Sequence, residues 1–191
     1  MQQFSKYCGK MVMRILICFL TAFMIAVSCA GPKKTQSAAV NKNSRDFFPL
    51  KNGCGWVYLV GDNKVQYQVR VLAADKDSGM IVWGNKTFAY VHKDDGVYNS
   101  TENYYTIKNG VQKWDVVKGK AEYIELKDKI VLKSGSYKAF AVKETYPDKK
   151  FYTMSYYGYM TGLIKFEVFS LDDGKLIEKM ELDSYLCSDP D

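Results

Sequence analysis

Apolar and polar residues alternate along most of the chain after residue 46. In the segments 65–71 and 164–168, Val, Ile, Tyr or Phe fills every second position, and Gln, Arg, Lys or Glu fills the positions between. This period of two is typical of β-strands with one buried and one hydrated face. No segment after residue 46 keeps an apolar stripe at helical spacing. We therefore expect strands throughout this part of the chain.

Turn residues separate the alternating segments at short intervals. Glycine, asparagine and aspartate recur at these points, as in residues 94–96 and 109–110. No proline lies between Pro49 and Pro147 to interrupt the pairing of strands. The spacing of turns predicts an all-β domain, an antiparallel meander of about ten to twelve strands that forms a curved sheet, a half-barrel or a barrel.

The composition agrees with a single globular domain. The 191 residues are 47% hydrophobic and 25% charged, which excludes a wholly disordered chain, a collagen-like repeat and a small disulfide scaffold. Part of the net charge of +6 comes from basic residues that precede Cys29, where no acidic residue occurs. The remaining charge gives little support to a nucleic-acid partner. The single histidine, His92, excludes a His-rich metal site.

The first 28 residues have the features of a signal peptide. Basic residues precede the apolar run 15–27, which is shorter than the about 20 residues that a membrane-spanning helix needs. The residues before Met13 are not needed for such a signal. Met11 and Met13 are therefore alternative starts to Met1.

Residues 26–30, Ala-Val-Ser-Cys-Ala, resemble the lipobox of bacterial lipoproteins. In that family the cysteine sulfur receives a diacylglycerol, the signal peptide is removed, and the new N-terminus is acylated, commonly with palmitate. The resemblance implies that Cys29 is lipidated and that the acyl chains hold the protein on a membrane. An ordinary secreted protein with an unrelated cysteine is the alternative.

The polar segment that follows contains no aromatic residue, and we expect it to be a flexible tether. The predicted order is a signal peptide in 1–28, the lipidated cysteine and tether in 29–45, and a single β-domain in 46–191. Among lipoproteins an aspartate after the cysteine often marks retention in the inner membrane, and Ala30 stands there instead. The resemblance thus favours the outer membrane, with the domain in the periplasm.

A second resemblance covers most of the β-domain. Residues 47–50 are Phe-Phe-Pro-Leu, Gly53 and Trp56 follow, residues 133–139 are Lys-Ser-Gly-Ser-Tyr-Lys-Ala, and residues 162–165 are Gly-Leu-Ile-Lys. In this order the motifs resemble a diffuse class of uncharacterised bacterial lipoproteins. That class has no established common activity. The resemblance therefore implies an all-β lipoprotein and supplies no catalytic residue.

Cys54 and Cys187 lie near the two ends of the β-domain. The first and last strands of a nearly closed sheet can be neighbours, so these residues are candidates for a disulfide in an oxidising envelope. Such a bond would add about 4–5 kcal/mol in the chain-entropy model; two unrelated thiols are the alternative. Two cysteines and a distant histidine do not supply the usual zinc ligands, and we expect no metal and no cofactor.

Candidates for catalysis are few. His92 shares a strand face with Phe88 and Tyr90, and neither a Gly-x-Ser-x-Gly elbow nor a suitably spaced thiol accompanies it. The acidic pairs 94–95 and 172–173 adjoin glycines, where turn formation explains them. No P-loop or dinucleotide fingerprint occurs. We interpret His92 as structural and expect a protein that is not an enzyme.

Aromatic residues are the strongest remaining signal. Several lie together in residues 151–159, and the poorly alternating segment 154–162 is a candidate for a flexible lip of a cavity. Core packing is the ordinary role of such residues, and the functional interpretation is that they bind a lipid, a glycan or a partner protein. The candidate ligand-binding residues are Trp83, Trp114, Tyr157 and Phe166.

Two functions of different classes remain open. The first is a membrane-anchored envelope lipoprotein whose domain binds an apolar ligand or an envelope partner, which requires a cavity or groove lined by aromatic strand residues. The second is an envelope hydrolase, for example one directed at glycans, that uses dispersed carboxylates. It requires two carboxylates about 5–10 Å apart in one cleft.

Overall fold

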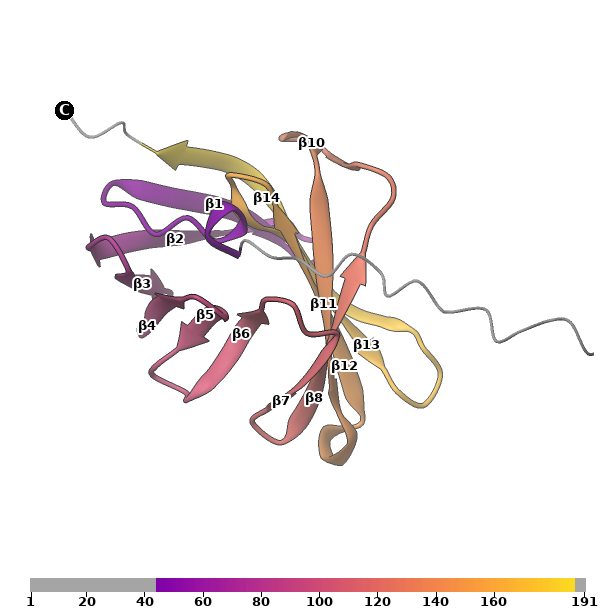
Figure 1. The fold of residues 1–191 in the computed structure, drawn as a ribbon. Coiled ribbons are helices and arrows are strands. Elements are labelled where there is room, and N and C mark those ends of the chain that lie inside the picture. Colours follow the sequence, from indigo (N-terminus) through magenta and orange to yellow (C-terminus); the bar gives the residue numbers. More distant parts are fainter. Residues whose placement is uncertain (1–43, 188–191) are drawn as a thin grey trace, which may run out of the picture. The chain divides into compact units, whose positions relative to one another are not determined.

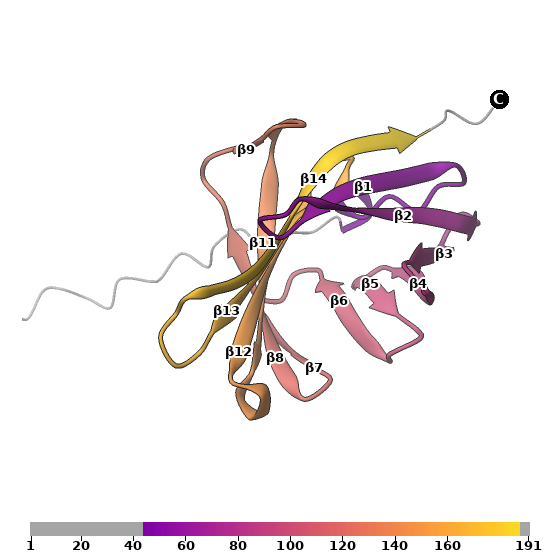
Figure 2. The same ribbon diagram turned by 180° about the vertical axis from the view of Figure 1, so that it is seen from behind.

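The structure is a computed structural model, and it describes residues 44–187. The expected signal peptide in 1–28, Cys29 and most of the tether lie outside the described residues. The described part forms fourteen β-strands and two short 3-10 helices (Figures 1 and 2). The elements are η1 (Ser44–Phe47), β1 (Cys54–Val60), β2 (Val65–Ala74), β3 (Ser78–Trp83), β4 (Lys86–Lys93), β5 (Gly96–Asn99), β6 (Tyr104–Lys108), β7 (Lys113–Val116), β8 (Gly119–Glu125), β9 (Ile130–Leu132), β10 (Gly135–Tyr137), β11 (Ala139–Tyr146), η2 (Pro147–Lys149), β12 (Phe151–Gly158), β13 (Gly162–Ser170) and β14 (Leu176–Cys187).

Twelve of these strands form one sheet in the order β6-β5-β4-β3-β2-β1-β14-β13-β12-β11-β8-β7. All neighbouring strands are antiparallel, and the sheet curls until it is nearly closed into a barrel. The predicted fold class is therefore confirmed. The remaining strands, β9 and β10, pair with each other in a separate hairpin between β8 and β11.

The barrel has a seam between β6 and β7, the two edge strands, which lie next to each other (Figure 1). The indole Nε1 of Trp114 on β7 donates a hydrogen bond to the backbone oxygen of Tyr105 on β6, at 2.8 Å. This side-chain bond links strands that share no ladder. It fixes the spacing of the seam where backbone pairing is absent.

The first and last strands of the chain are neighbours in the sheet. β1 pairs with β14 so that Cys54 lies opposite Cys187, with their Cα atoms 4.0 Å apart, and the two sulfur atoms are bonded. Because the ends of the domain pair with each other, the seam falls in the middle of the sequence. The disulfide encloses a sequence separation of 133 residues.

Among the described residues, the hydrophobic core occupies the inside of the barrel. Tyr58, Ile107, Ile164 and Leu182 are its largest fully buried side chains. The Tyr58 hydroxyl donates a hydrogen bond of 2.8 Å to the carbonyl of Leu163, and burial raises the pKa of this phenol. The unit thus has a core of its own, and its buried phenol has a partner.

The turns of the meander alternate between the two ends of the barrel, and segment 44–50 covers one of these ends. The backbone N–H of Ser44 donates to the side-chain oxygen of Asn109 in the β6–β7 turn, at 3.2 Å. The N–H of Met160 in the β12–β13 turn donates to the carbonyl of Asp46. We call this end the closed end. The opposite end, where the β3–β4, β5–β6, β7–β8 and β11–β12 turns lie, we call the open end.

Motifs that carry the sequence resemblance meet at the closed end. Gly162 has a positive φ of 91°, and a Cβ on it would lie 3.4 Å from both Pro49 and the indole nitrogen of Trp56. That nitrogen donates a hydrogen bond to the carbonyl of Thr161. The β9–β10 hairpin reaches the same region, because a Cβ on Gly158 would lie 3.4 Å from Tyr137. These motifs therefore build the packed end of the barrel.

Candidate functional site: a hollow barrel interior

The interior of the barrel is hollow toward the open end. Three adjoining hollows of about 840, 520 and 70 Å³ share lining residues. Glu102, Tyr104 and Phe166 line both larger hollows, whereas Trp83 and Tyr90 line both the middle and the smallest one. We call the three hollows together the interior cavity. Volumes of several hundred Å³ are typical of sites that enclose a small molecule.

One side of the interior cavity is aromatic. Tyr58 on β1 and Trp83 on β3 stack with ring centroids 6.0 Å apart. Phe88 on β4 and Phe166 on β13 also line the cavity and are only partly buried. An apolar group that enters the barrel would displace water from these rings, which is favourable in proportion to the apolar area covered.

The other side of the interior cavity is polar. It is formed by β6, β11 and β12 around the seam, together with the β5–β6 turn. Its lining includes Tyr104, Glu144, Tyr146 and Thr153, with Glu102 exposed at the mouth. Glu178, from β14, lines both larger hollows and is likewise exposed. The cavity wall is therefore amphipathic, with rings on one side and carboxylates, phenols and hydroxyls on the other.

Glu144 is the carboxyl group that is most shielded from water in this lining. Desolvation raises its pKa above the ordinary value, and the charge of Glu102 acts in the same direction. The Tyr146 hydroxyl donates a 2.8 Å hydrogen bond to Glu144 Oε2, which acts in the opposite direction. Burial, and then the charge of Glu144, raises the pKa of Tyr104 and Tyr146. These phenols therefore stay neutral hydrogen-bond donors at every physiological pH.

The three carboxyl groups of the interior cavity form no ion pair with any other described residue. None of the salt bridges among residues 44–187 involves Glu102, Glu144 or Glu178. Lysines do occur at the mouth, where Lys118 and Lys149 line the largest hollow. The acidic charge on the wall thus has no bonded cation from residues 44–187.

Two threonine hydroxyls on the cavity wall lack hydrogen-bond partners. Thr106 and Thr153 are only 9% and 5% exposed, and the Oγ1 atom of each is buried without a partner. Thr106 lines the smallest hollow and Thr153 the largest. A buried hydroxyl in this state is costly, and such atoms are uncommon in folded proteins.

Three of the four residues that the sequence suggested for ligand binding line the interior cavity, and the fourth lies elsewhere. Trp83 and Phe166 line the interior cavity near the middle of the barrel, and Tyr157 lines its smallest hollow. Trp114 lies at the seam instead, where its indole bonds to Tyr105. Sequence reasoning missed Glu144. The available signal was an acidic residue at the same strand parity as Phe140 and Val142, which are buried.

Segment 154–162, expected as a flexible lip, lies away from the open end. It forms the last part of β12, the β12–β13 turn and the start of β13, and the turn contacts η1 at the closed end. Its poor alternation has a local cause, because the β12–β13 register shifts between Tyr156 and Tyr157. The irregularity moves successive aromatic side chains relative to the two faces of the sheet.

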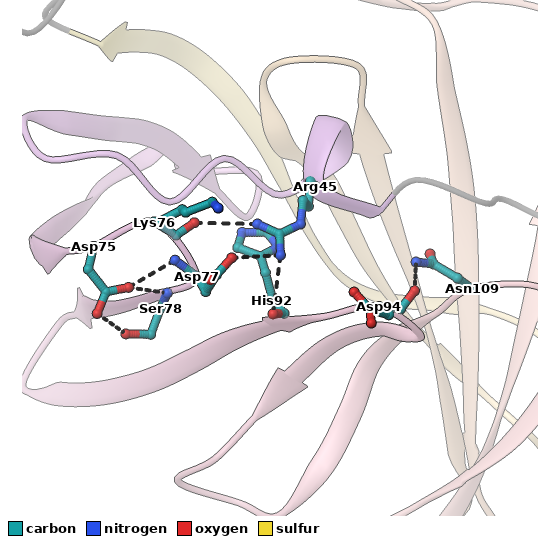
Figure 3. Close-up of polar contacts among 8 residues, drawn as sticks. All are labelled: Arg45, Asp75, Lys76, Asp77, Ser78, His92, Asp94 and Asn109. Atoms are coloured by element: carbon teal, nitrogen blue, oxygen red, sulfur yellow. Dashed lines mark hydrogen bonds and ion pairs between the residues drawn. The ribbon is translucent and has the colours of Figure 1, made fainter.

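His92 belongs to a polar cluster at the closed end (Figure 3). The guanidinium of Arg45 forms a 2.7 Å ion pair with Asp77 and donates to the carbonyls of Lys76 and His92. Desolvation and then the charge of Arg45 lower the pKa of His92, against the opposing effects of Asp77 and of a backbone hydrogen bond to Phe48. The histidine thus lies beside the contacts that fasten η1.

The acidic pairs singled out in the sequence lie in turns at opposite ends of the barrel. Asp95 accepts a hydrogen bond from Tyr105 at the closed end, and Asp173 accepts one from the backbone of Lys175 in the β13–β14 turn. Within residues 44–187, no three His, Cys, Asp or Glu side chains are grouped so that they could hold a metal ion. No helix in this part of the chain is long and apolar enough to span a membrane.

Comparison with known proteins finds likeness only among solved structures. No protein-family model matches the chain, and no curated protein matches it. One similar structure is a "putative lipoprotein" from Parabacteroides distasonis, with 12% identity and a TM-score of 0.43 over 73% of this chain and 98% of that one. Another is a "putative exported protein with YmcC-like fold" from Bacteroides fragilis, with 9% identity and a TM-score of 0.44 over 74% and 99%. Because both TM-scores are below 0.5, these likenesses carry no conclusion about function.

Proposed function

We propose that this chain is a lipid-anchored protein of the bacterial envelope whose barrel binds a lipid-like ligand without catalysis. The observation that carries the proposal is the interior cavity, whose larger hollows of about 520 and 840 Å³ are lined by strand aromatics. Concave sites of this volume, with a few polar groups among apolar ones, are typical of ligand sites. The lipobox at Cys29 supports the membrane anchor, with the outer membrane and the periplasm as the proposed location.

The position of Ser44, where the described residues begin, supports this arrangement. The described chain begins at Ser44, and η1 docks on the closed end. The point where the tether joins the domain and the mouth of the cavity are therefore at opposite ends of the barrel. A ligand can reach the mouth without displacing the segment that fastens the N-terminus.

Native mass spectrometry tests the proposal directly. The protein without its lipid, beginning at Ala30 and exported in its native host, is purified without detergent and sprayed intact. We expect a bound species that adds the mass of a lipid-like molecule and is lost on organic extraction. Phe166→Ala should reduce the bound fraction. Phe169→Ala is the matched control, because that ring stacks on Tyr152 with centroids 4.9 Å apart and does not line the cavity. A bare protein in every preparation would contradict the ligand and favour a protein partner.

The hydrolase remains the second candidate because of one observation. Glu102, Glu144 and Glu178 line one hollow, and the pKa of Glu144 is raised as in a general acid. Two of the three, however, are exposed at the mouth. Assay against fluorogenic glycosides and peptidoglycan fragments distinguishes the candidates. We expect no turnover, whereas turnover that Glu144→Gln abolishes would establish the hydrolase.

A further inference from the structure

We infer that the ligand of the interior cavity carries an organic ammonium group, which the polar side of the cavity receives. This inference rests on the proposed function and names the chemical class of the molecule bound. The ligand would be amphipathic, with an apolar chain against the aromatic side and a primary ammonium group near Glu144. Three independent features of the wall support this assignment.

The first feature is charge. Glu102, Glu144 and Glu178 share the largest hollow, and none of the three takes part in an ion pair within the described residues. A carboxylate shielded from water is stabilised by a nearby positive charge. The lysines at the mouth do not meet this need, so the wall attracts a cation from outside. An anionic ligand would add its charge to the existing repulsion.

The second feature is an orphaned hydroxyl. Thr153 Oγ1 is buried in the wall of the largest hollow without a partner. Thr153 and Glu144 line the same hollow from the neighbouring strands β12 and β11. A primary ammonium has three N–H donors, and hydroxyl and carboxylate oxygens accept them. The Thr153 hydroxyl thus gains a partner that it lacks among the described residues.

The third feature is the aromatic surroundings. Tyr104, Tyr146 and Phe166 line the hollow that contains the carboxyl groups, and aromatic faces attract organic cations. The protein already shows this preference at the mouth, where Lys149 Nζ lies 5.7 Å from the ring centroid of Tyr146 and 5.9 Å from that of Phe151. Rings and carboxylates together favour an alkylammonium over a hydrated metal ion, which needs a cluster of oxygen ligands.

Isothermal titration with three probes of equal chain length tests the inference. Octylammonium, 1-octanol and octanoate are titrated separately into the protein that begins at Ala30, which keeps all of the described residues 44–187. We expect octylammonium to bind at least about tenfold more tightly than 1-octanol, and octanoate to bind most weakly. Glu144→Gln should remove most of the preference for the ammonium while leaving the affinity for 1-octanol unchanged.

A matched control separates the site from the overall charge. Glu122→Gln removes the same charge from the outer surface, where Glu122 pairs with Lys113 at 3.3 Å, and it should keep the full preference. Equal affinity for octylammonium and 1-octanol would overturn the ammonium inference and leave the proposed function standing. Tighter binding of octanoate would overturn it as well. Binding of none of the probes would contradict this inference, while the native mass spectrum judges the proposed function separately.

Discussion

The two ends of the barrel use the same strands and similar aromatic residues for opposite purposes. At the closed end, Trp56 is 5% exposed, its indole is hydrogen-bonded, and it packs against Pro49 and Gly162 beside only the smallest hollow, of about 70 Å³. At the open end, Phe166 points into a hollow and stays partly exposed. A side chain that is fully packed contributes to stability, whereas one that faces an accessible hollow is available to a ligand. The comparison assigns stability to the closed end and binding to the open end.

Substitution of one aromatic residue at each end tests this division and has the largest expected effect. Trp56→Ala should lower the free energy of unfolding by about 3–5 kcal/mol, because it leaves a cavity in packed surroundings. Phe166→Ala should cost only about 1–2 kcal/mol, because part of its ring is not packed. Urea unfolding followed by fluorescence measures both values. Equal costs would mean that the two ends are packed alike, and the division would be wrong.

More of the closed end than of the open end could be predicted from the sequence. Alternation predicted the strands, and the expectation that the first and last strands adjoin placed Cys54 near Cys187. Alternation cannot tell whether an inward aromatic side chain is packed or borders a hollow, because that depends on the curvature of the whole sheet. Trp114 illustrates this, since it lies at a seam that only the strand order reveals.

The polar side of the cavity could not be predicted from the sequence, for a related reason. Glu102, Glu144 and Glu178 are far apart in the sequence, and curling of the sheet brings them to one hollow. The acidic residues considered as candidates in the sequence lie beside glycines, where turn formation explains them. The useful signal is the parity of Glu144 on β11, because an acid on the inward face of a strand needs either a partner or a cavity.

The pH dependence of stability should have opposite signs at the two ends. The pKa of Glu144 is raised in the folded protein, so over a range above its ordinary value of 4.5 the folded state keeps a proton that the unfolded chain has released. The free energy of unfolding therefore falls as the pH rises through this range, by about 1.4 kcal/mol for each unit of the increase in pKa. The groups that face Glu144 are Glu102, Tyr90, Tyr104, Tyr146 and Tyr157.

His92 at the closed end provides the contrasting case. Desolvation and Arg45 lower its pKa below the ordinary value of 6.5, so the unfolded chain binds the proton more readily and stability falls as the pH drops below that value. Urea midpoints from about pH 4 to 8 are compared for the wild type, Glu144→Gln and His92→Gln. As the pH rises, the urea midpoint of the wild type should fall relative to that of Glu144→Gln and rise relative to that of His92→Gln. Parallel curves would show that neither group is desolvated as the structure requires.

Removal of one orphaned hydroxyl has the smallest expected effect on stability. It also tests directly whether this hydroxyl contacts the ligand. Thr153→Val replaces a buried hydroxyl without a partner by a methyl group, so it should leave the free energy of unfolding unchanged or raise it by up to about 1 kcal/mol. The same change should weaken the binding of octylammonium and leave that of 1-octanol unaltered. Thr145→Val, at a position of opposite parity to the cavity-lining Glu144 and Tyr146 on β11, is the control and should change neither affinity. If Thr153 acted only in packing, Thr153→Val would lower the free energy of unfolding without changing the preference for the ammonium. A gain in stability combined with a loss of that preference would show that the hydroxyl is kept for the ligand at a cost to the fold.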